Sequence, residues 1–449
     1  MIIPHKRTTM ILYTTAVCNL KCVYCFIDKS PTLVKIDKIL DNSFSSDYYF
    51  EFSKQIFEKD LLEQIQFWGG EPSIGLHRVY NLLPKFIEYY PRLYEFMMST
   101  NFTPSNWFDE FYGFLEILGR YPDRPFKFSL QLSIDGPEKL NDENRGIGVT
   151  KNFLEHFDEL IATIPNRVPR NVTLEIHFKQ TYSNQTIAQL QTEEAVYEYF
   201  KFFDDLITKF NDALKFGNIR FIPTIPNTAT PGSHTIQDGK NFANYCRITK
   251  SLEKQQLFKN FTCITSYMPR DYRGKDDFKN YHTQCATCGA GIQNMGLLPD
   301  YNISLCHSGF TNILEEYKLN SRNNHMDDAD DATVLKALFT YDKETLPMCM
   351  PYEEFKKIEK LLLCFYDDEN TFQMTNLVAL IKILAASGQI SKRFLKEEDA
   401  IAAAKYYLTS TAFCMRDNVA VTGSVTMYPY GLLKLLLNGA YEYLVEGKE

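Results

Sequence analysis

The chain has 449 residues, of which 45% are hydrophobic and 23% charged, and its formal net charge is −8. This length exceeds one ordinary domain and suits a large barrel with an appended region. No apolar run in the sequence is long enough to span a bilayer, and no signal-peptide core precedes the first apolar segment, so we expect a cytoplasmic protein with no membrane partner. Because no block of Lys or Arg resembles a phosphate-binding stripe, the composition also disfavours nucleic acid as the main partner.

Eleven cysteines without an export signal indicate metal ligation or redox chemistry rather than disulfides. Three of them, Cys18, Cys22 and Cys25, follow an apolar run at 10–13 that predicts a buried strand, so they lie on a loop that leaves it. Three thiolates in one loop can hold three corners of a cubic four-iron cluster. The alternative is a structural zinc loop, but zinc requires four ligands, and neither a His nor a fourth Cys is near in the sequence.

Apolar runs of strand length alternate with segments of helical spacing after this loop. The expected strands are at 10–13, 64–68, 94–98, 126–132, 172–178 and 219–223, and the expected helices between them are at 79–89, 107–118, 153–164 and 195–210. Such alternation predicts an α/β fold with a parallel sheet and helices outside it. Periodicity alone does not separate a partial (β/α)6 barrel over about residues 8–227 from a doubly wound sheet.

Polar motifs follow three of these strands, at the sheet edge where ligands gather in parallel α/β folds. The second strand runs into Gly69-Gly70-Glu71-Pro72, the third into Ser99-Thr100-Asn101, and the fourth into Ser133-Ile134-Asp135-Gly136-Pro137. The segment 141–146 then contributes Arg145. By themselves these residues are open to plainer interpretations: a simple turn at the glycines, a turn cap at Asp135 and a surface position for Arg145.

The cysteine spacing, with an aromatic residue before the third cysteine, resembles that of the radical S-adenosylmethionine (SAM) enzymes. The Gly-Gly-Glu-Pro motif after strand two also resembles a motif of that family, and the motif after strand four resembles that of its peptide-modifying and sulfatase-maturing branch. The resemblance implies the barrel rather than the doubly wound sheet. It also implies a [4Fe–4S] cluster on the three cysteines, SAM bound at the open iron, and a reductant such as flavodoxin or ferredoxin.

The same resemblance implies roles for individual residues at the SAM site. Gly69, Gly70 and Glu71 would contact the SAM amino group, Ser133 and Arg145 its carboxylate, and Asp135 the ribose. The full set of implied cofactor-binding residues is Tyr24, Gly69, Gly70, Glu71, Ser99, Asn101, Ser133, Asp135 and Arg145. Two positions depart from the family pattern: Phe102 replaces a glycine after Asn101, and Asn141 replaces a histidine.

A second cysteine group, Cys285, Cys288 and Cys306, surrounds a hairpin-like turn. It resembles the auxiliary iron–sulfur segment of SPASM and twitch-type members, although Tyr301 replaces the family glycine in that turn. We expect one auxiliary cluster, whose fourth ligand would be Cys349, Cys364 or Cys414, or whose open iron would bind substrate. Zinc remains the alternative, because Cys-x-x-Cys occurs in both kinds of site.

The predicted segments are the barrel at 1–227, a helical connector at 228–284, the auxiliary-cluster hairpin at 285–310 and a mainly helical region at 311–449. His307 and Cys414 are the candidate catalytic residues. Sulfatase-maturing members have an Asp that acts as a base directly after the final cysteine of this segment. This chain has His307 there instead, which resembles the peptide cross-linking members. Cys414 could donate a hydrogen atom, or could be a buried structural thiol.

The resulting hypothesis is an enzyme that cleaves SAM to a 5′-deoxyadenosyl radical and modifies a peptide or protein side chain by cross-linking, oxidation or epimerisation. The alternatives are a formylglycine-forming sulfatase-maturing enzyme, a small-molecule radical SAM enzyme, or a zinc-binding interaction protein without catalysis.

Overall fold

The structure is a computed structural model, and it describes residues 7–25, 31–213, 219–224, 236–258, 260, 294–304, 349–353, 355–356, 378, 381–382, 385–386, 388 and 390–410. Cys285, Cys288, Cys306, His307 and Cys414 lie outside these residues. The chain divides into two compact units. The first comprises Met1–Gln180, Lys209–Ile222 and Gly289–Lys357, and the second comprises Thr181–Thr208, Pro223–Cys288 and Ile358–Glu449.

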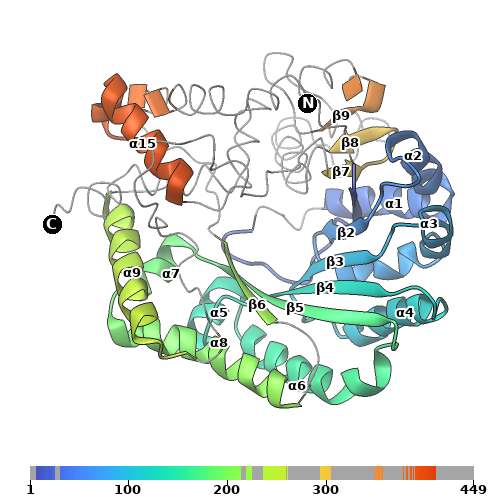
Figure 1. The fold of residues 1–449 in the computed structure, drawn as a ribbon, viewed down its shortest axis with the longest axis horizontal. Helices are drawn as coiled ribbons and strands as arrows, with labels where there is room; N and C mark the ends of the chain where they lie inside the picture. The colour runs from blue at the N-terminus through green and yellow to red at the C-terminus, as the bar shows by residue number, and fades with distance from the viewer. Residues whose placement is uncertain are drawn as a thin grey trace. The chain divides into compact units, whose positions relative to one another are not determined.

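One sheet organises the first unit, with the strand order β6-β5-β4-β3-β2-β1-β7-β8-β9 among the described strands (Figure 1). The first six are β1 (Thr9–Thr15), β2 (Gln64–Gly69), β3 (Glu95–Thr100), β4 (Phe126–Ser133), β5 (Val172–Thr181) and β6 (Ile219–Thr224). Each of the six predicted strands is therefore present. β1 to β5 pair in parallel and in chain order. A doubly wound sheet reverses its order after the first strands. Consecutive order is that of a barrel, so the partial-barrel prediction is confirmed.

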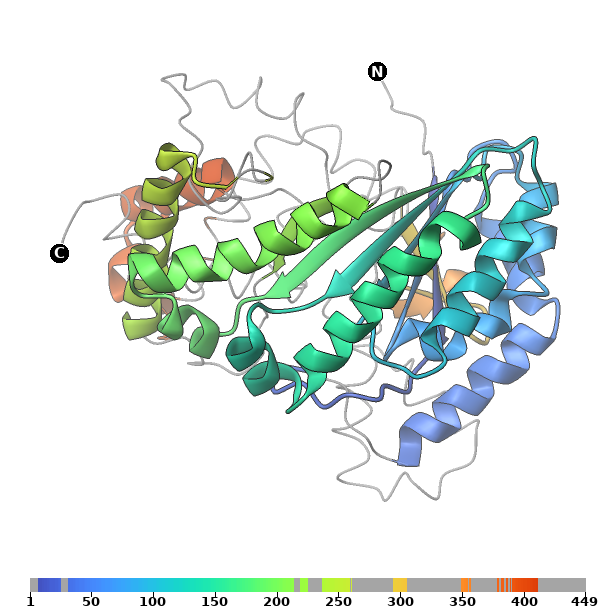
Figure 2. The ribbon, with the colours of Figure 1, turned by 90° about the horizontal axis from the view of Figure 1, so that it is seen from below.

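Helices of the first unit follow the strands (Figures 1 and 2). They are α1 (Pro31–Ser45), α2 (Tyr48–Ile56), α3 (Leu83–Tyr89), α4 (Trp107–Gly119), α5 (Glu138–Arg145) and α6 (Val149–Arg167), with a 3₁₀ helix at Pro72–Val79. Sequence periodicity did not predict α1, α2 or α5. It predicted one helix at 79–89, but the α-helix begins at Leu83, because Pro84 is tolerated in the first turn and not in a helix interior.

The two faces of the sheet differ in chemistry because side chains alternate along each strand. On one face, Phe67, Phe96 and Phe128 contact Phe114 of α4, with ring centroids 5.4 Å apart in each case. Phe178 of β5 contacts Phe157 of α6 on the same face. The residues between them, including Trp68, Ser99, Gln131 and Lys179, are half-buried and lie on the opposite face. The barrel thus has an apolar face covered by helices and a polar face turned away from them.

The predicted hairpin at 285–310 contributes two strands to this same sheet. β7 (Asn294–Leu297) pairs in parallel with β1, β8 (Asn302–Ser304) pairs with β7, and β9 (Cys349–Pro351) pairs with β8. The turn between β7 and β8 has positive φ angles at Asp300 (58°) and Tyr301 (56°). This is the conformation of a two-residue hairpin turn that usually requires glycine or asparagine.

Tyr301 adopts this backbone conformation although it replaces the glycine of the family motif. Its N–H donates to the Tyr48 hydroxyl at 2.6 Å. Its ring meets those of Tyr48 and Phe52 edge-on, with centroids 5.2 and 5.3 Å apart. These contacts with α2 offset the strain of a left-handed non-glycine residue, which is of the order of 1 kcal/mol.

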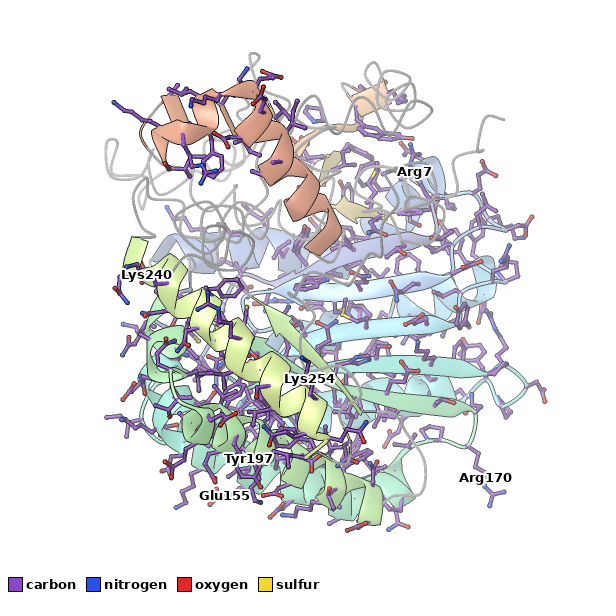
Figure 3. The ribbon with its side chains drawn as sticks, turned by 60° about the vertical axis from the view of Figure 1, so that its left-hand side comes forward. Arg7, Glu155, Arg170, Tyr197, Lys240 and Lys254 are labelled. Carbon is purple, nitrogen blue, oxygen red and sulfur yellow. The ribbon has the colours of Figure 1, made fainter. Side chains whose placement is uncertain are left out.

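The second unit contains α7 (Asn184–Gln189), most of α8 (Glu193–Ala213), α9 (Ile236–Gln255), a 3₁₀ helix at Lys392–Leu395 and α15 (Glu397–Ser410). Figure 3 shows Lys240 and Lys254 near the two ends of α9 and Tyr197 on α8. Cys246 of α9 is buried, and burial raises the pKa of its thiol to about 12. Within the described part of the chain, no helix is both long enough and apolar enough to cross a membrane.

Candidate cofactor site

The cysteine loop is anchored where it leaves β1. Asp37 of α1 accepts hydrogen bonds from the Thr15 hydroxyl and from the Ala16 N–H, the latter at 2.9 Å. Arg78 donates to Asp37 at 2.7 Å and to the Thr14 carbonyl at 2.8 Å. This ion pair therefore fixes the point at which the strand ends and the loop begins. Sequence reasoning missed Asp37 and Arg78, because Asp37 is 22 positions from Thr15 and Arg78 is 41 positions from Asp37.

The far end of the loop is held by the segment that follows β4. The Val23 N–H donates to the Asn144 carbonyl at 2.8 Å. The Tyr24 hydroxyl donates to the Asp135 carboxylate at 2.7 Å. Between them, the Cys25 N–H donates to the Cys22 carbonyl at 3.0 Å, which closes a tight turn. The aromatic residue before the third cysteine thus links the loop to the fourth strand.

The Gly-Gly-Glu turn lies directly against the cysteine loop. The Gly70 N–H donates to the Thr15 carbonyl at 2.9 Å, and the Glu71 N–H donates to the Val17 carbonyl at 2.8 Å. A Cβ at Gly69, where φ is 143°, would lie 2.1 Å from the Thr15 oxygen, and one at Gly70 would lie 2.4 Å from the Val17 oxygen. Both glycines are therefore required for the close approach of two backbone segments.

Glu71 joins the carboxyl ends of β2 and β3. Its buried carboxylate accepts four hydrogen bonds: from the N–H and hydroxyl of Ser73 at 3.2 and 2.7 Å, from the Thr100 hydroxyl at 2.6 Å, and from the Asn101 N–H at 2.6 Å. Burial raises the pKa of Glu71, and these hydrogen bonds oppose the rise. The side chain predicted to contact SAM is thus also the support that aligns two neighbouring strand ends.

Asn101 lies beside the first cysteine. Its side-chain amide donates to the Cys18 sulfur at 3.7 Å and to the Asn19 side chain at 2.8 Å. The next residue, Phe102, has a φ of 62° and is fully buried against Trp107 and Phe153. Phe102 therefore adopts a left-handed conformation that glycine tolerates more easily, and aromatic packing offsets the strain.

Asp135 and Arg145 form a buried pair. Arg145 donates through Nε and one terminal nitrogen to the two carboxylate oxygens, at 3.0 and 2.8 Å. Desolvation would lower the pKa of Arg145, but Asp135 outweighs it and holds the pKa well above its ordinary value. Asn141, at the family's histidine position, accepts from the Asp135 N–H at 2.8 Å and donates to Thr150 at 2.9 Å. The predicted carboxylate ligand of SAM is thus held in place by the predicted ribose ligand.

The three thiols predicted to hold a cubic cluster lie on the same loop. All are half-buried on one loop, and the Leu20 N–H points to the Cys18 sulfur at 3.5 Å. Burial raises the pKa of Cys18 to about 12, and Glu71, Cys22 and Cys25 add to the rise. Bound iron reverses such a rise, because it favours the thiolate. Among the described residues no three His, Cys, Asp or Glu side chains converge on a single ion. A cubic cluster does not require convergence, since each thiolate binds a different iron.

Lys179 and Trp68 lie at the same edge of the sheet and were not singled out from the sequence. The Lys179 ammonium lies 4.7 Å from the centre of the Trp68 ring and donates to the Ser99 hydroxyl at 3.5 Å. Lys179 is also the register partner of Ser133. A signal was present: a lysine ends a strand that alternates polar and apolar residues, one strand after a candidate site motif.

Comparison with known proteins was made by family, by curated sequence and by structure. No family model matches the chain, and no curated protein matches its sequence. The structure is similar to Streptococcus suis SuiB solved with S-adenosylmethionine, at 15% identity and a TM-score of 0.37, over 67% of this chain and 58% of SuiB. This chain thus spans less than two thirds of SuiB.

The structure is also similar to anSMEcpe with bound AdoMet, at 13% identity and a TM-score of 0.42, over 98% of each chain. A third similar structure is anSMEcpe with AdoMet and the Cp18Cys peptide, at 15% identity and a TM-score of 0.42, over 98% of this chain and 99% of that one. At TM-scores below 0.5 we draw nothing further from these overlaps.

The order of the motifs and their positions at the carboxyl ends of β1 to β4 can be compared directly with the family pattern. The chain resembles radical SAM enzymes. In the structure the glycine turn contacts the cysteine loop, Asn101 contacts Cys18, and the residues after β4 hold Tyr24.

Proposed function

We propose that this chain is a radical SAM enzyme that modifies a peptide or protein side chain by cross-linking, oxidation or epimerisation. The observation that carries the proposal is the meeting of three cysteines, the Gly-Gly-Glu turn and the Asp135–Arg145 pair at one edge of a parallel sheet. The Gly-Gly-Glu turn and Asp135 are hydrogen-bonded to the segment that carries the cysteines, and Arg145 is bonded to Asp135. This edge is where ligands bind in such folds.

Cys18, Cys22 and Cys25 would hold the cluster and leave one iron without a protein ligand. The cluster supplies the electron that breaks a sulfur–carbon bond of SAM, and thereby the radical that removes a hydrogen atom from the substrate. The chain itself binds and orients. The carboxyl ends of β2 and β3, joined by Glu71, would receive the amino end of SAM, and the Asp135–Arg145 pair would receive its ribose and carboxylate.

The auxiliary cluster is part of the same proposal. Cys285, Cys288 and Cys306 would supply three ligands. Cys349 is favoured as the fourth, because it is the register partner of Ser304, two residues before Cys306 in the chain. His307 and Cys414 remain the candidate base and hydrogen donor. A sulfatase-maturing activity is the second candidate function, and a precursor peptide or a sulfatase encoded nearby would distinguish the two.

The decisive experiment replaces Cys18, Cys22 and Cys25 together with alanine. After anaerobic reconstitution with iron and sulfide, we expect about eight iron atoms in the wild-type chain and about four in the triple variant, since a four-iron cluster is lost. We also expect the variant to form no 5′-deoxyadenosine from SAM upon reduction. Cys246→Ala is the matched control, and it should retain both the iron and the cleavage. Deoxyadenosine formation by the triple variant, or zinc in place of iron, would overturn the proposal.

A further inference from the structure

Two lysines on the polar face of the sheet have opposite electrostatic surroundings. Lys127 lies near the amino end of β4, and Lys179 lies near the carboxyl end of β5. Both are half-buried, and both positions alternate with the apolar residues that face α4 and α6. Because both side chains lie on the same face of the sheet, the groups around each ammonium can be compared.

Lys127 is neutralised by the protein itself. Its ammonium lies 3.2 Å from Glu95 of β3 and 3.0 Å from Glu175 of β5. These carboxylates raise the pKa of Lys127 against the effect of desolvation. This is how a charge in a partly dry interior is normally accommodated, because an unpaired one is costly.

Lys179 has no such partner. Among the residues that the structure describes, no carboxylate lies within 4.0 Å of its ammonium, and its contacts are the Ser99 hydroxyl and the Trp68 ring. The nearby cation Arg145 is engaged by Asp135, and its charge adds to the effect of burial, which lowers the pKa of Lys179 to about 8. Lys179 thus lies beside a second cation, Arg145, at the carboxyl end of β5, where ligands gather in such folds. The described residues supply no anion to balance its charge, so a ligand is expected to supply one.

We propose that Lys179, Trp68 and Ser99 form a binding site for a ligand carboxylate, and that the bound carboxylate is the counter-ion of Lys179. This inference rests on the proposed function and specifies its ligand chemistry. The Trp68 ring holds the ammonium from one side and the Ser99 hydroxyl offers a further donor, so a carboxylate would meet two hydrogen-bond donors, one from β5 and one from β3.

Two sources could provide this carboxylate. One is the methionine moiety of SAM, since Lys179 is the register partner of Ser133. The other is an acidic side chain of the peptide substrate. In either case the site selects for a negative charge, because a neutral group would leave the ammonium uncompensated.

The first test measures the stability of the ligand-free protein. Lys179→Met removes an uncompensated cation and retains a side chain of similar length, so we expect the thermal midpoint to rise. Lys127→Met is the matched control, and its midpoint should fall, since Glu95 and Glu175 lose their shared cation. A fall with Lys179→Met as large as that with Lys127→Met would identify Lys179 as an ordinary structural residue and overturn the proposal.

The second test measures affinity by calorimetry with the reconstituted holoenzyme. The probes are SAM against decarboxylated SAM, and, with SAM bound, N-acetylglutamate against N-acetylglutamine, both used as their α-amides so that they differ only in the side-chain carboxylate. If Lys179 receives the SAM carboxylate, Lys179→Met weakens SAM binding about tenfold or more and leaves decarboxylated SAM unaffected. If it receives a substrate carboxylate, the variant loses the preference for N-acetylglutamate, and SAM affinity stays as in the wild type.

Lys179→Arg should restore part of whichever preference is lost, because it keeps the charge. Both preferences unchanged in Lys179→Met would overturn the inference. Failure of the proposed function has a different signature: the wild-type holoenzyme would bind neither SAM nor decarboxylated SAM, while the stability test and the N-acetylglutamate preference, then measured without SAM, would still decide the role of Lys179.

Discussion

The two ends of the polar sheet face follow opposite electrostatic designs. At the amino end, the Lys127 ammonium is paired with two carboxylates, Glu95 and Glu175, and His177 lies 3.6 Å from Glu175. At the carboxyl end, Lys179 contacts Ser99 and Trp68, feels the positive charge of Arg145, and has no carboxylate within 4.0 Å among the described residues. The difference teaches that a lysine on this face has carboxylate partners where it supports the fold, and none among the described residues where ligands are expected to bind.

The largest expected effect comes from unbalancing the pair that supports the cysteine loop. Asp135→Asn leaves the buried Arg145 without its counter-charge and weakens the bond from Tyr24, so we expect a loss of ~3 kcal/mol in the free energy of unfolding. Urea denaturation of the ligand-free protein measures this. Tyr24→Phe is the control, because it removes one hydrogen bond and should cost only ~1 kcal/mol. Equal stability of Asp135→Asn and wild type would contradict the role assigned to the pair.

A smaller effect on stability is expected at the amino end of the polar face, where Lys127 is paired with Glu95 and Glu175. Glu175→Gln removes one of the two carboxylates at Lys127 and leaves Glu95, so we expect a loss of ~1 kcal/mol, reduced from that of a fully buried pair by partial exposure. Because no ligand is assigned to this end, the affinity of the holoenzyme for SAM should be unchanged. Calorimetry with SAM checks this, and a tenfold weaker binding would show that the two ends are not independent.

The smallest effect on stability is the pH dependence due to Lys179. Burial holds its pKa at about 8, below the ordinary 10.5, so between these values the unfolded chain binds more protons than the folded one. The contribution of Lys179 to the stability of the ligand-free protein should therefore rise with pH over this range, by up to ~1 kcal/mol after allowance for partial exposure, whereas the raised pKa values of Cys18 and Cys246 act in the opposite direction. The pKa values of Tyr24 and Arg145 lie well above their ordinary values, so neither group contributes to this rise in stability.

The difference between wild type and Lys179→Met isolates this contribution, since other groups titrate equally in both. Affinity for a carboxylate should show the opposite sign and fall as pH rises above 8, because the ammonium loses its charge. Unfolding curves and calorimetry at pH 7.5, 8.5 and 9.5 measure the two trends. A flat difference curve would mean that Lys179 keeps its ordinary pKa.

Two substitutions in the sequence motifs show how far local patterns can be trusted. Phe102 and Tyr301 each occupy a family glycine position, and the sequence left the geometry at both positions open. In the structure both have φ near 60°, the left-handed conformation that glycine adopts easily. Aromatic contacts with residues far along the chain, such as Trp107 for Phe102 and Tyr48 for Tyr301, stabilise a conformation that local preference disfavours.

The sequence by itself determined the features that depend on neighbouring residues. Six strands, several of their helices and the three-cysteine loop were predictable, because alternating apolar residues and close ligand spacing are local properties. Strand order, the pairing of β7 with β1, and the anchoring of the loop by Asp37 and Arg78 were decided by tertiary structure alone.

The same holds for charge. The residues next to Lys127 and Lys179 do not reveal which lysine has carboxylate partners, since each follows a phenylalanine on a strand of alternating residues. Only the parallel packing of β3, β4 and β5 brings two glutamates to the first lysine, and only the fold places a tryptophan, 111 positions away in the chain, against the second. Whether a charge is balanced depends on neighbours in space, and these are set by the sheet.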